Sequence, residues 1–395
     1  MTTDQQTKTK LSFTAPVDAL LEASSKLLAV VPAKSPKPVL SNIQFSVRDG
    51  VLEMAGTDFV AGVYYAIPAA TVRGEGTGLL NGARFSEVLK EFRGVDATIV
   101  FNPRGGCQFK AKGGSYKVVG DDTRDYPKTR RFDDMTGLDM TGAELVDMIK
   151  KTEFAAAPEE SRNTINGALV EHKKGRLRLV ATDNKRMSIT QLQLETKFDD
   201  FSVSVPKEFL RAVLKVTTKD VAGKPAVLGV TGTKIFFRLP GATVYSTVLQ
   251  GNYPPYEEGL GIKLSHHIDC NIGELLSTIR RSMLVNSSLA AFNFTTELLS
   301  LSGMSSAVGA GDSDMATGWV PPEGIERVRV GFNPRYFKDA LEAMTAKRCR
   351  LLFEGPRKAG VLKELVTAIG PNGMTEMVSE KFVYAVMPAL LPREV

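Results

Sequence analysis

The residues best suited to chemistry are few and scattered. The chain of 395 residues contains three histidines and three cysteines. His266, His267 and Cys270 are close enough in sequence to suggest a metal site, but a structural zinc site needs a fourth ligand, and none stands beside them. His172 adjoins a Lys-Lys-Gly turn, where we expect it to be solvated. Unevenly spaced cysteines favour neither a disulfide framework nor a paired-cysteine zinc site, so we predict no metal and no cofactor.

Carboxylates form a second set of candidates. Asp58 and Asp183 each follow a threonine at the end of a strand-like run. A turn-forming hydrogen bond explains both, because an aspartate side chain readily accepts hydrogen bonds from nearby backbone amides. The alternative is an enzyme acting on DNA or nucleotides, with Asp58, Asp183 or Asp312 holding a metal ion. The chain has neither a Gly-x-x-x-x-Gly-Lys-Ser/Thr loop nor a Gly-x-Ser-x-Gly motif, so we predict no catalytic residues.

The segments that contain these residues recur along the chain. The pairs Thr57-Asp58 and Thr182-Asp183 are 125 positions apart, and the pairs Tyr126-Pro127 and Tyr253-Pro254 are 127 positions apart. Apolar, helix-like segments recur at the same spacing around Leu89, Leu214 and Leu341. A period of about 130 residues is the size of an ordinary domain. We therefore predict three tandem domains, at residues 1–134, 135–262 and 263–395.

Each repeat combines helices with a larger number of strands. The first opens with apolar residues at helical spacing from Val17 to Val31, and Pro32 ends that pattern. Thr141 and Glu144 have the spacing of a capping box at the start of the second repeat. Elsewhere, apolar and polar residues alternate as in half-buried strands. These patterns predict an α+β fold of three similar domains, each with two helices packed on antiparallel sheets.

The charge distribution allows two interpretations. Lys and Arg number 50 against 44 Asp and Glu, for a net charge of +6 and a pI of about 9.0. Acidic residues tend to begin the predicted helices, which complements the helix dipoles; alternatively, the basic residues form a shared face for phosphates. A polar N-terminus and the lack of any run of about 18 apolar residues predict a cytoplasmic protein without a membrane partner. The basic residues on predicted helices are Lys26, Lys90, Arg93, Lys150, Lys151, Arg211, Lys215, Arg280, Arg281, Lys338 and Lys347.

Five segments of the chain carry a resemblance to a known family. They are residues 37–43, 162–167, 179–186, 251–256 and 384–388. In sequence and order they resemble the bacterial DNA sliding clamp, the beta subunit of DNA polymerase III, from about Leu11 to Pro388. The resemblance implies a processivity factor and not an enzyme. It implies a head-to-tail homodimer of six similar domains, with strands outside and helices around a central hole for duplex DNA.

The resemblance also favours the DNA-facing interpretation of the helix bases. Contact with phosphates carries no sequence information, so such a ring could move along the duplex. Lys34 and Arg162 match loop positions of the family that approach DNA. A β-rich scaffold unrelated to DNA remains the further alternative. The predicted DNA-binding residues are Lys34, Lys90, Lys150, Arg162, Arg211, Lys215, Arg280 and Arg281.

The family has a second site, a hydrophobic cleft between the second and third domains. It accepts short linear motifs of the DNA polymerase III alpha subunit, the clamp loader, other polymerases and repair proteins. Met187 and Met387 suit simple core packing equally well, and Asn184-Lys185 replaces the family's common Gly-His. The residues that the resemblance assigns to the cleft are Ile165, Thr182, Asn184, Lys185, Arg186, Met187, Pro254, Val386, Met387 and Pro388.

Overall fold

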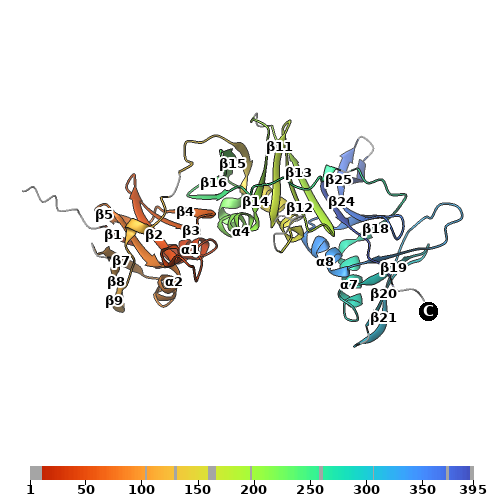
Figure 1. The fold of residues 1–395 in the computed structure, drawn as a ribbon, viewed down its shortest axis with the longest axis horizontal. Coiled ribbons are helices and arrows are strands. Elements are labelled where there is room, and N and C mark those ends of the chain that lie inside the picture. The colour runs from red at the N-terminus through yellow and green to blue at the C-terminus, as the bar shows by residue number, and fades with distance from the viewer. Residues whose placement is uncertain are drawn as a thin grey trace, which may run out of the picture. The chain divides into compact units, whose positions relative to one another are not determined.

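The chain forms two units, whose elements are labelled in Figure 1. The structure is a computed structural model, and it describes residues 11–102, 105–128, 131–158, 166–195, 198–257, 261–305, 307–370 and 373–391. Unit 1 comprises Met1–Val146, Thr196–Phe198 and Val205–Leu249. Unit 2 comprises Asp147–Glu195, Asp199–Ser204 and Gln250–Val395.

Unit 1 contains two antiparallel sheets and the helices α1 (Val17–Leu27), α2 (Gly82–Lys90), α4 (Lys207–Val216) and α5 (Lys219–Ala222). The five-stranded sheet has the order β5 (Thr71–Arg73), β1 (Ser12–Pro16), β7 (Asp96–Phe101), β8 (Cys107–Ala111), β9 (Gly114–Val118). The eight-stranded sheet has the order β10 (Leu138–Thr141), β15 (Pro225–Thr231), β16 (Lys234–Leu239), β17 (Ala242–Thr247), β4 (Ala61–Ile67), β3 (Val51–Thr57), β2 (Asn42–Arg48), β6 (Thr77–Asn81).

Unit 2 also contains two antiparallel sheets, with the helices α7 (Ile272–Ser282) and α8 (Pro334–Ala343) and the end of α3 (Gly142–Lys150). Its eight-stranded sheet has the order β14 (Phe201–Pro206), β11 (Gly167–Lys173), β12 (Arg176–Thr182), β13 (Arg186–Gln193), β25 (Gly373–Val386), β24 (Gly360–Gly370), β23 (Arg348–Phe353), β18 (His266–Asn271). Its four-stranded sheet has the order β21 (Gly309–Ala316), β20 (Leu298–Ser305), β19 (Ala290–Phe294), β22 (Val328–Phe332).

The strand order repeats three times. One group of four strands occurs as β1-β7-β8-β9, as β10-β15-β16-β17 and as β18-β23-β24-β25. The other group occurs as β6-β2-β3-β4, as β14-β11-β12-β13 and as β22-β19-β20-β21. Two pairings join neighbouring groups into eight-stranded sheets, β17 with β4 and β13 with β25. The predicted α+β fold built of repeats is confirmed, whereas the domain boundaries stay a prediction.

The helices begin where local sequence predicts. In the capping box, the Thr141 hydroxyl accepts a hydrogen bond from the Glu144 amide, and the Glu144 carboxylate accepts one from the Thr141 amide at 2.7 Å. Asn271 caps α7, and Asn333 caps α8 ahead of Pro334. The helices then pack on the sheets through aromatic residues. Phe85 of α2 meets Phe45 at 5.2 Å between ring centroids, and the corresponding helix α8 makes an equivalent contact in the third repeat.

No helix within the described residues is long and apolar enough to cross a membrane.

Candidate peptide-binding cleft and DNA-contact residues

Unit 2 contains a cavity of about 490 Å³ at the junction of β13 and β25. Its size is that of a ligand pocket. It lies over a core cluster that includes Val180, Ile189 and Tyr256. Short-range alternation along both strands puts apolar side chains into the cavity. The lining residues are Thr182, Asn184, Arg186, Met187, Pro254, Pro255, Ile262, Ala359, Ala385 and Met387.

The cavity gathers six of the ten residues that the resemblance assigns to the cleft, and three of the other four are not part of its lining. Val386 is fully buried and points away, because its neighbours Ala385 and Met387 take the cavity side of the strand. Lys185 contributes a backbone carbonyl, which accepts a hydrogen bond from the Met387 amide at 2.8 Å, and its side chain is exposed. Pro388 is half-buried outside the lining, and Ile165 lies outside the described residues.

Four lining residues were missed by the sequence analysis. Ala385 could have been found, because strand alternation puts it on the same face as Met387. Pro255 follows a predicted lining residue, Pro254. No signal in the sequence indicates Ile262 or Ala359, which lie in loops and reach the cavity only through the fold.

A tight turn between β12 and β13 forms one wall. The Thr182 hydroxyl donates to the Arg186 carbonyl at 2.7 Å, and the Asp183 carboxylate accepts from the backbone amides of Lys185 and Arg186, each at 3.0 Å. Asn184 has a φ of 67°, a conformation that asparagine tolerates well. The predicted turn-forming role of Asp183 is therefore confirmed.

Arg186 connects this turn to the third repeat. Its guanidinium donates to Asp183 at 3.0 Å, to Asp339 of α8 at 2.6 Å and to the Phe154 carbonyl at 2.7 Å. It also lies 4.5 Å from the centroid of the Tyr336 ring. Burial alone would lower the pKa of Arg186, but Tyr384 and the two carboxylates raise it above its usual range. A permanent, well-anchored cation therefore lies at the rim of the cavity.

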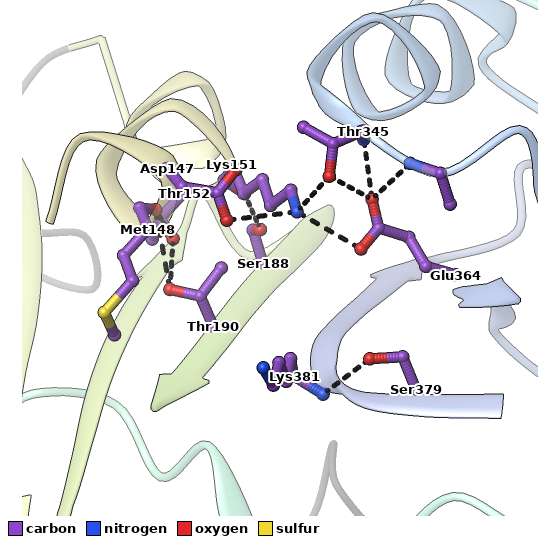
Figure 2. Close-up of polar contacts among 11 residues, drawn as sticks. Asp147, Met148, Lys151, Thr152, Ser188, Thr190, Thr345, Glu364, Ser379 and Lys381 are labelled. Atoms are coloured by element: carbon purple, nitrogen blue, oxygen red, sulfur yellow. Dashed lines mark hydrogen bonds and ion pairs between the residues drawn. The ribbon is translucent and has the colours of Figure 1, made fainter. Parts of the chain in front are cut away.

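A buried ion pair joins the second and third repeats within unit 2 (Figure 2). The Lys151 ammonium lies 3.2 Å from the Glu364 carboxylate of β24 and 3.1 Å from Asp147, and it donates to the Thr345 hydroxyl at 3.0 Å. Lys151 and Glu364 are only 5% and 4% exposed. The Lys151 carbonyl accepts a hydrogen bond from Ser188 of β13. This network holds α3, β13 and β24 together.

Two of the helix bases thus cannot contact DNA. Lys151 is buried in the network just described. Lys26 is 2% exposed; its ammonium lies 2.5 Å from the Glu22 carboxylate and 2.8 Å from the Tyr65 hydroxyl. For these two lysines the DNA-facing interpretation is wrong, because they lie on the sheet-facing side of α1 and at the end of α3. Neither belongs to the predicted DNA-binding set.

The predicted DNA-binding residues that the structure describes are all exposed: Lys34, Lys90, Lys150, Arg211, Lys215, Arg280 and Arg281. Arg162 lies outside the described residues. Arg211 and Lys215 lie one turn apart on α4 and so share a face. Their contact with DNA stays a prediction.

The two arginines at the end of α7 have protein partners as well. Arg280 forms an ion pair with Glu342 at 2.7 Å and lowers its pKa. Arg281 donates to the Ser313 hydroxyl of β21 at 3.0 Å. Figure 1 shows α7 and α8 next to each other beside this sheet. Part of the positive charge of this helix end is therefore balanced within unit 2.

Of the three residues that suggested a metal site, His266 and Cys270 pack in the core, whereas His267 is exposed. His266 is 5% exposed and lies 5.5 Å from Trp319 and 5.6 Å from Phe353, measured between ring centroids. The Cys270 thiol lies 3.8 Å from that of Cys349 across two paired strands. In the part of the chain that the structure describes, no three His, Cys, Asp or Glu side chains gather as metal ligands.

The expected solvation of His172 is wrong. The residue is 1% exposed, and Nδ1 lies 3.2 Å from the Asp199 carbonyl. Its ring centroid lies 5.9 Å from that of Phe201. His172 is an inward-facing residue of β11, which ends at Lys173, and Lys174 begins the turn that follows.

Comparison with known proteins identifies the family. The sequence profile of the DNA polymerase III beta subunit, N-terminal domain, matches residues 11–129, and that of its central domain matches residues 139–255. Together they cover more than half of the chain. The beta sliding clamp of Streptococcus pneumoniae serotype 4 is 26% identical over 360 residues, which cover 87% of this chain and 92% of that protein. The beta sliding clamp of Bacillus subtilis is 22% identical over 366 residues, covering 89% and 96%.

Solved structures show the same fold. The crystal structure of the Bacillus subtilis DNA polymerase sliding clamp matches with a TM-score of 0.86 at 20% identity, over 97% of this chain and 100% of that one. A sliding clamp from Pseudomonas aeruginosa, bound to griselimycin, matches with a TM-score of 0.85 at 19% identity, over 97% and 100%. Sequence profiles, relatives and fold agree, and the chain belongs to the family of the DNA polymerase III beta subunit, the DNA sliding clamps.

Proposed function

We propose that two copies of this chain close head to tail into a ring around duplex DNA and act as a non-catalytic processivity factor. The observation that carries this proposal is the strand order. β17 pairs with β4, and β25 pairs with β13. Each pairing joins the last strand of one four-strand group to the last strand of the other kind of group, so two of the three equivalent pairings are made within the chain. The equivalent strands β9 and β21 are sheet edges among the described residues. Pairing β21 of one copy with β9 of the next continues the pattern.

The two edges have the side chains that such a junction requires. Tyr116 of β9 is 50% exposed, and Val119, which directly follows that strand, is 83% exposed. Around the β20–β21 hairpin, Met304 is 71% and Val308 is 66% exposed. Exposed apolar residues on an open edge strand favour association. Because the two edges differ, the contact is head to tail, and a closed symmetric dimer uses it twice.

Sedimentation equilibrium tests this closure. We expect a dimer at micromolar concentration, and a shift toward monomer when Val119→Asp places a charge in the β9 edge. Leu390→Asp is the matched control, because Leu390 is 94% exposed but belongs to neither edge. A monomeric wild type, or equal behaviour of the two variants, would contradict the proposed junction.

We assign duplex binding to the exposed helix bases. Replacing Arg211 and Lys215 by Ala should weaken binding equally for all sequences and reduce the salt dependence, because phosphate contacts carry no base information. The control is the pair Lys173→Ala and Lys174→Ala, which removes the same charge from two exposed residues, the last of β11 and the first of the turn that follows it. Equal losses in both double variants would show a nonspecific charge effect and no DNA-binding face.

We assign the unit 2 cavity to short linear motifs with an apolar anchor, such as those of the DNA polymerase III alpha subunit, the clamp loader, other polymerases and repair proteins. Its walls supply Met187, Pro254 and Met387, and its rim supplies the Arg186 cation and backbone groups. Met387→Ala should weaken a Leu- and Phe-bearing peptide by at least about tenfold, or about 1.4 kcal/mol, in calorimetry. Met377→Ala is the control, since Met377 of β25 does not line the cavity and is 53% exposed, against 54% for Met387, which directly follows that strand.

A catalytic function has less support. Asp58 uses its carboxylate to accept hydrogen bonds from the amides of Val60 and Ala61, as Asp183 does for its own turn. The carboxylates of these two aspartates therefore accept hydrogen bonds from backbone amides and have a structural role. Turnover of DNA or nucleotides in the presence of magnesium would contradict a non-catalytic role.

A further inference from the structure

An exposed aromatic residue in a strained conformation marks the turn between β3 and β4. Phe59 and Val60 are 45% and 44% exposed. Phe59 has a φ of 78°, which bulky residues rarely adopt and which costs about 1 kcal/mol or more. The turn is held by the Thr57 hydroxyl, which accepts from the Phe59 amide at 3.1 Å, and by Asp58.

The second repeat shows that this turn does not require an aromatic residue. The equivalent position, 125 residues later, is Asn184, with a φ of 67° and the same threonine and aspartate hydrogen bonds. Asparagine adopts this conformation easily. Unit 1 therefore presents a phenyl ring to solvent at a cost in backbone strain, and such strain is concentrated at functional sites.

Two lysines accompany the ring. The Lys37 ammonium lies 4.6 Å from the Phe59 ring centroid, and Lys34 is exposed in the same loop. The loop lies beside the turn because Val31, at its start, packs on Gly56 of β3, where a Cβ would be 2.4 Å from the valine side chain. Asp58 directs its carboxylate to backbone amides. Lys37 and, three residues before it in the same loop, Lys34 therefore supply two positive charges beside the single negative charge of this turn.

We propose that Phe59 stacks on an unpaired base of single-stranded DNA while Lys34 and Lys37 contact the adjoining phosphates. Exposed aromatics and lysines bind single strands in this way without sequence preference, because every base has a flat face. An apolar peptide would gain nothing from two neighbouring ammonium groups. The site goes beyond the proposed function, which needs only duplex DNA, and it is complete within unit 1, so it does not depend on ring closure.

Binding of a short fluorescent oligothymidylate tests the stacking. The reference is an abasic oligonucleotide of equal length, which has the same phosphates but no bases. At low salt the wild type should bind the oligothymidylate more tightly by at least about fivefold, and Phe59→Asn should remove this preference. Phe59→Tyr should retain it. Because Asn occupies the equivalent turn, the Phe59→Asn variant should fold, with a melting temperature no lower than that of the wild type.

The lysines should affect both oligonucleotides. Lys37→Ala should weaken binding of the oligothymidylate and of the abasic strand alike, whereas Lys112→Ala, which removes an exposed charge from the β8–β9 turn, should change neither. A preference for bases that survives in Phe59→Asn overturns the proposal. So does a Phe59 dependence that appears with apolar peptides and not with DNA.

Discussion

The same sheet junction occurs twice in the chain, but only one of the two contains the cleft. In unit 2, β13 meets β25, and the Met387 amide donates to the Lys185 carbonyl at 2.8 Å. In unit 1, β4 meets β17, and the Thr247 amide donates to the Val60 carbonyl at 2.7 Å. Each junction also follows a Thr-Asp turn. The two backbones therefore make the same contacts.

Side-chain size distinguishes the junctions. In unit 2, Met187 stands opposite Ala385, and the small alanine leaves room for the cavity. In unit 1 the equivalent pair is Gly62 and Tyr245. The Tyr245 ring lies over the glycine, where a Cβ would be only 2.3 Å from the ring, and it packs with Phe132 and other aromatics as part of a buried cluster. Duplication thus preserves the junction, and one large side chain closes it.

Buried lysines show a second difference. Lys26 and Lys151 stand at equivalent positions, 125 residues apart. Lys26 pairs with Glu22, whose side chain is 52% exposed. Lys151 pairs with Glu364, whose side chain is 5% exposed. A buried pair costs more to break, because the remaining charge has no water to solvate it. The junction with the cleft is therefore the one held by a fully buried ion pair.

Breaking the Lys151–Glu364 ion pair should have the largest effect on stability. Lys151→Met should destabilise unit 2 by about 3–5 kcal/mol, because it leaves the Glu364 carboxylate buried without the cation that neutralises it. Lys26→Met should cost clearly less. The only tryptophan, Trp319, is 3% exposed in unit 2 and reports Lys151→Met by fluorescence during denaturation. The double variant Lys151→Met/Glu364→Met should recover most of the loss; equal costs for both lysines would refute this difference.

Opening the closed junction of unit 1 should have the second-largest effect on stability. Tyr245→Ala removes a buried ring and should destabilise unit 1 by about 3 kcal/mol, as expected for a large cavity. Circular dichroism on thermal unfolding measures the loss, with Val60→Ala as the control, because Val60 of the same unit is 44% exposed and belongs to neither proposed dimer edge. A melting temperature unchanged from that of the wild type would show that Tyr245 is not the residue that fills this junction.

Closing the open junction should abolish the peptide site. The double variant Met187→Gly/Ala385→Tyr gives unit 2 the residues of unit 1, and the new ring should occupy the cavity. We expect peptide affinity to fall by at least about tenfold, with dimerisation and duplex binding unchanged. If calorimetry shows wild-type affinity, side-chain size at these two positions does not control the cleft.

The smallest effect concerns the strained turn. Phe59→Asn should stabilise unit 1 by about 1 kcal/mol, because asparagine relieves the positive φ. Asn184→Phe is the reciprocal variant and should destabilise its own turn by a similar amount. Chemical denaturation measures both changes, and a loss of stability in Phe59→Asn would show that the ring contributes packing and not strain.

Features that depend on neighbours in sequence could be predicted. The recurring Thr-Asp and Tyr-Pro pairs reveal the repeats, and the turn role of Asp58 follows from the chemistry of its own side chain. Thr182, Met187 and Met387 were assigned to the cleft by resemblance, and all three line the cavity.

Features that depend on distant partners could not be predicted. Lys151 resembles any other helix lysine until the fold brings Glu364, 213 positions away, to its ammonium. Ile262 and Ala359 lie in loops, and only the fold brings them to the cavity. The contact between Lys37 and Phe59 likewise exists only in the folded chain, since basic and aromatic residues do not alternate in the sequence.

Retention on DNA of defined topology tests the central claim most directly. The chain is loaded onto nicked circular DNA with a clamp loader, and the amount bound is followed before and after a single cut linearises the circle. A ring that encloses the duplex should remain on the circle and be lost from the linear DNA by sliding off its ends. Equal retention on both forms would show that the protein binds the DNA surface without encircling it.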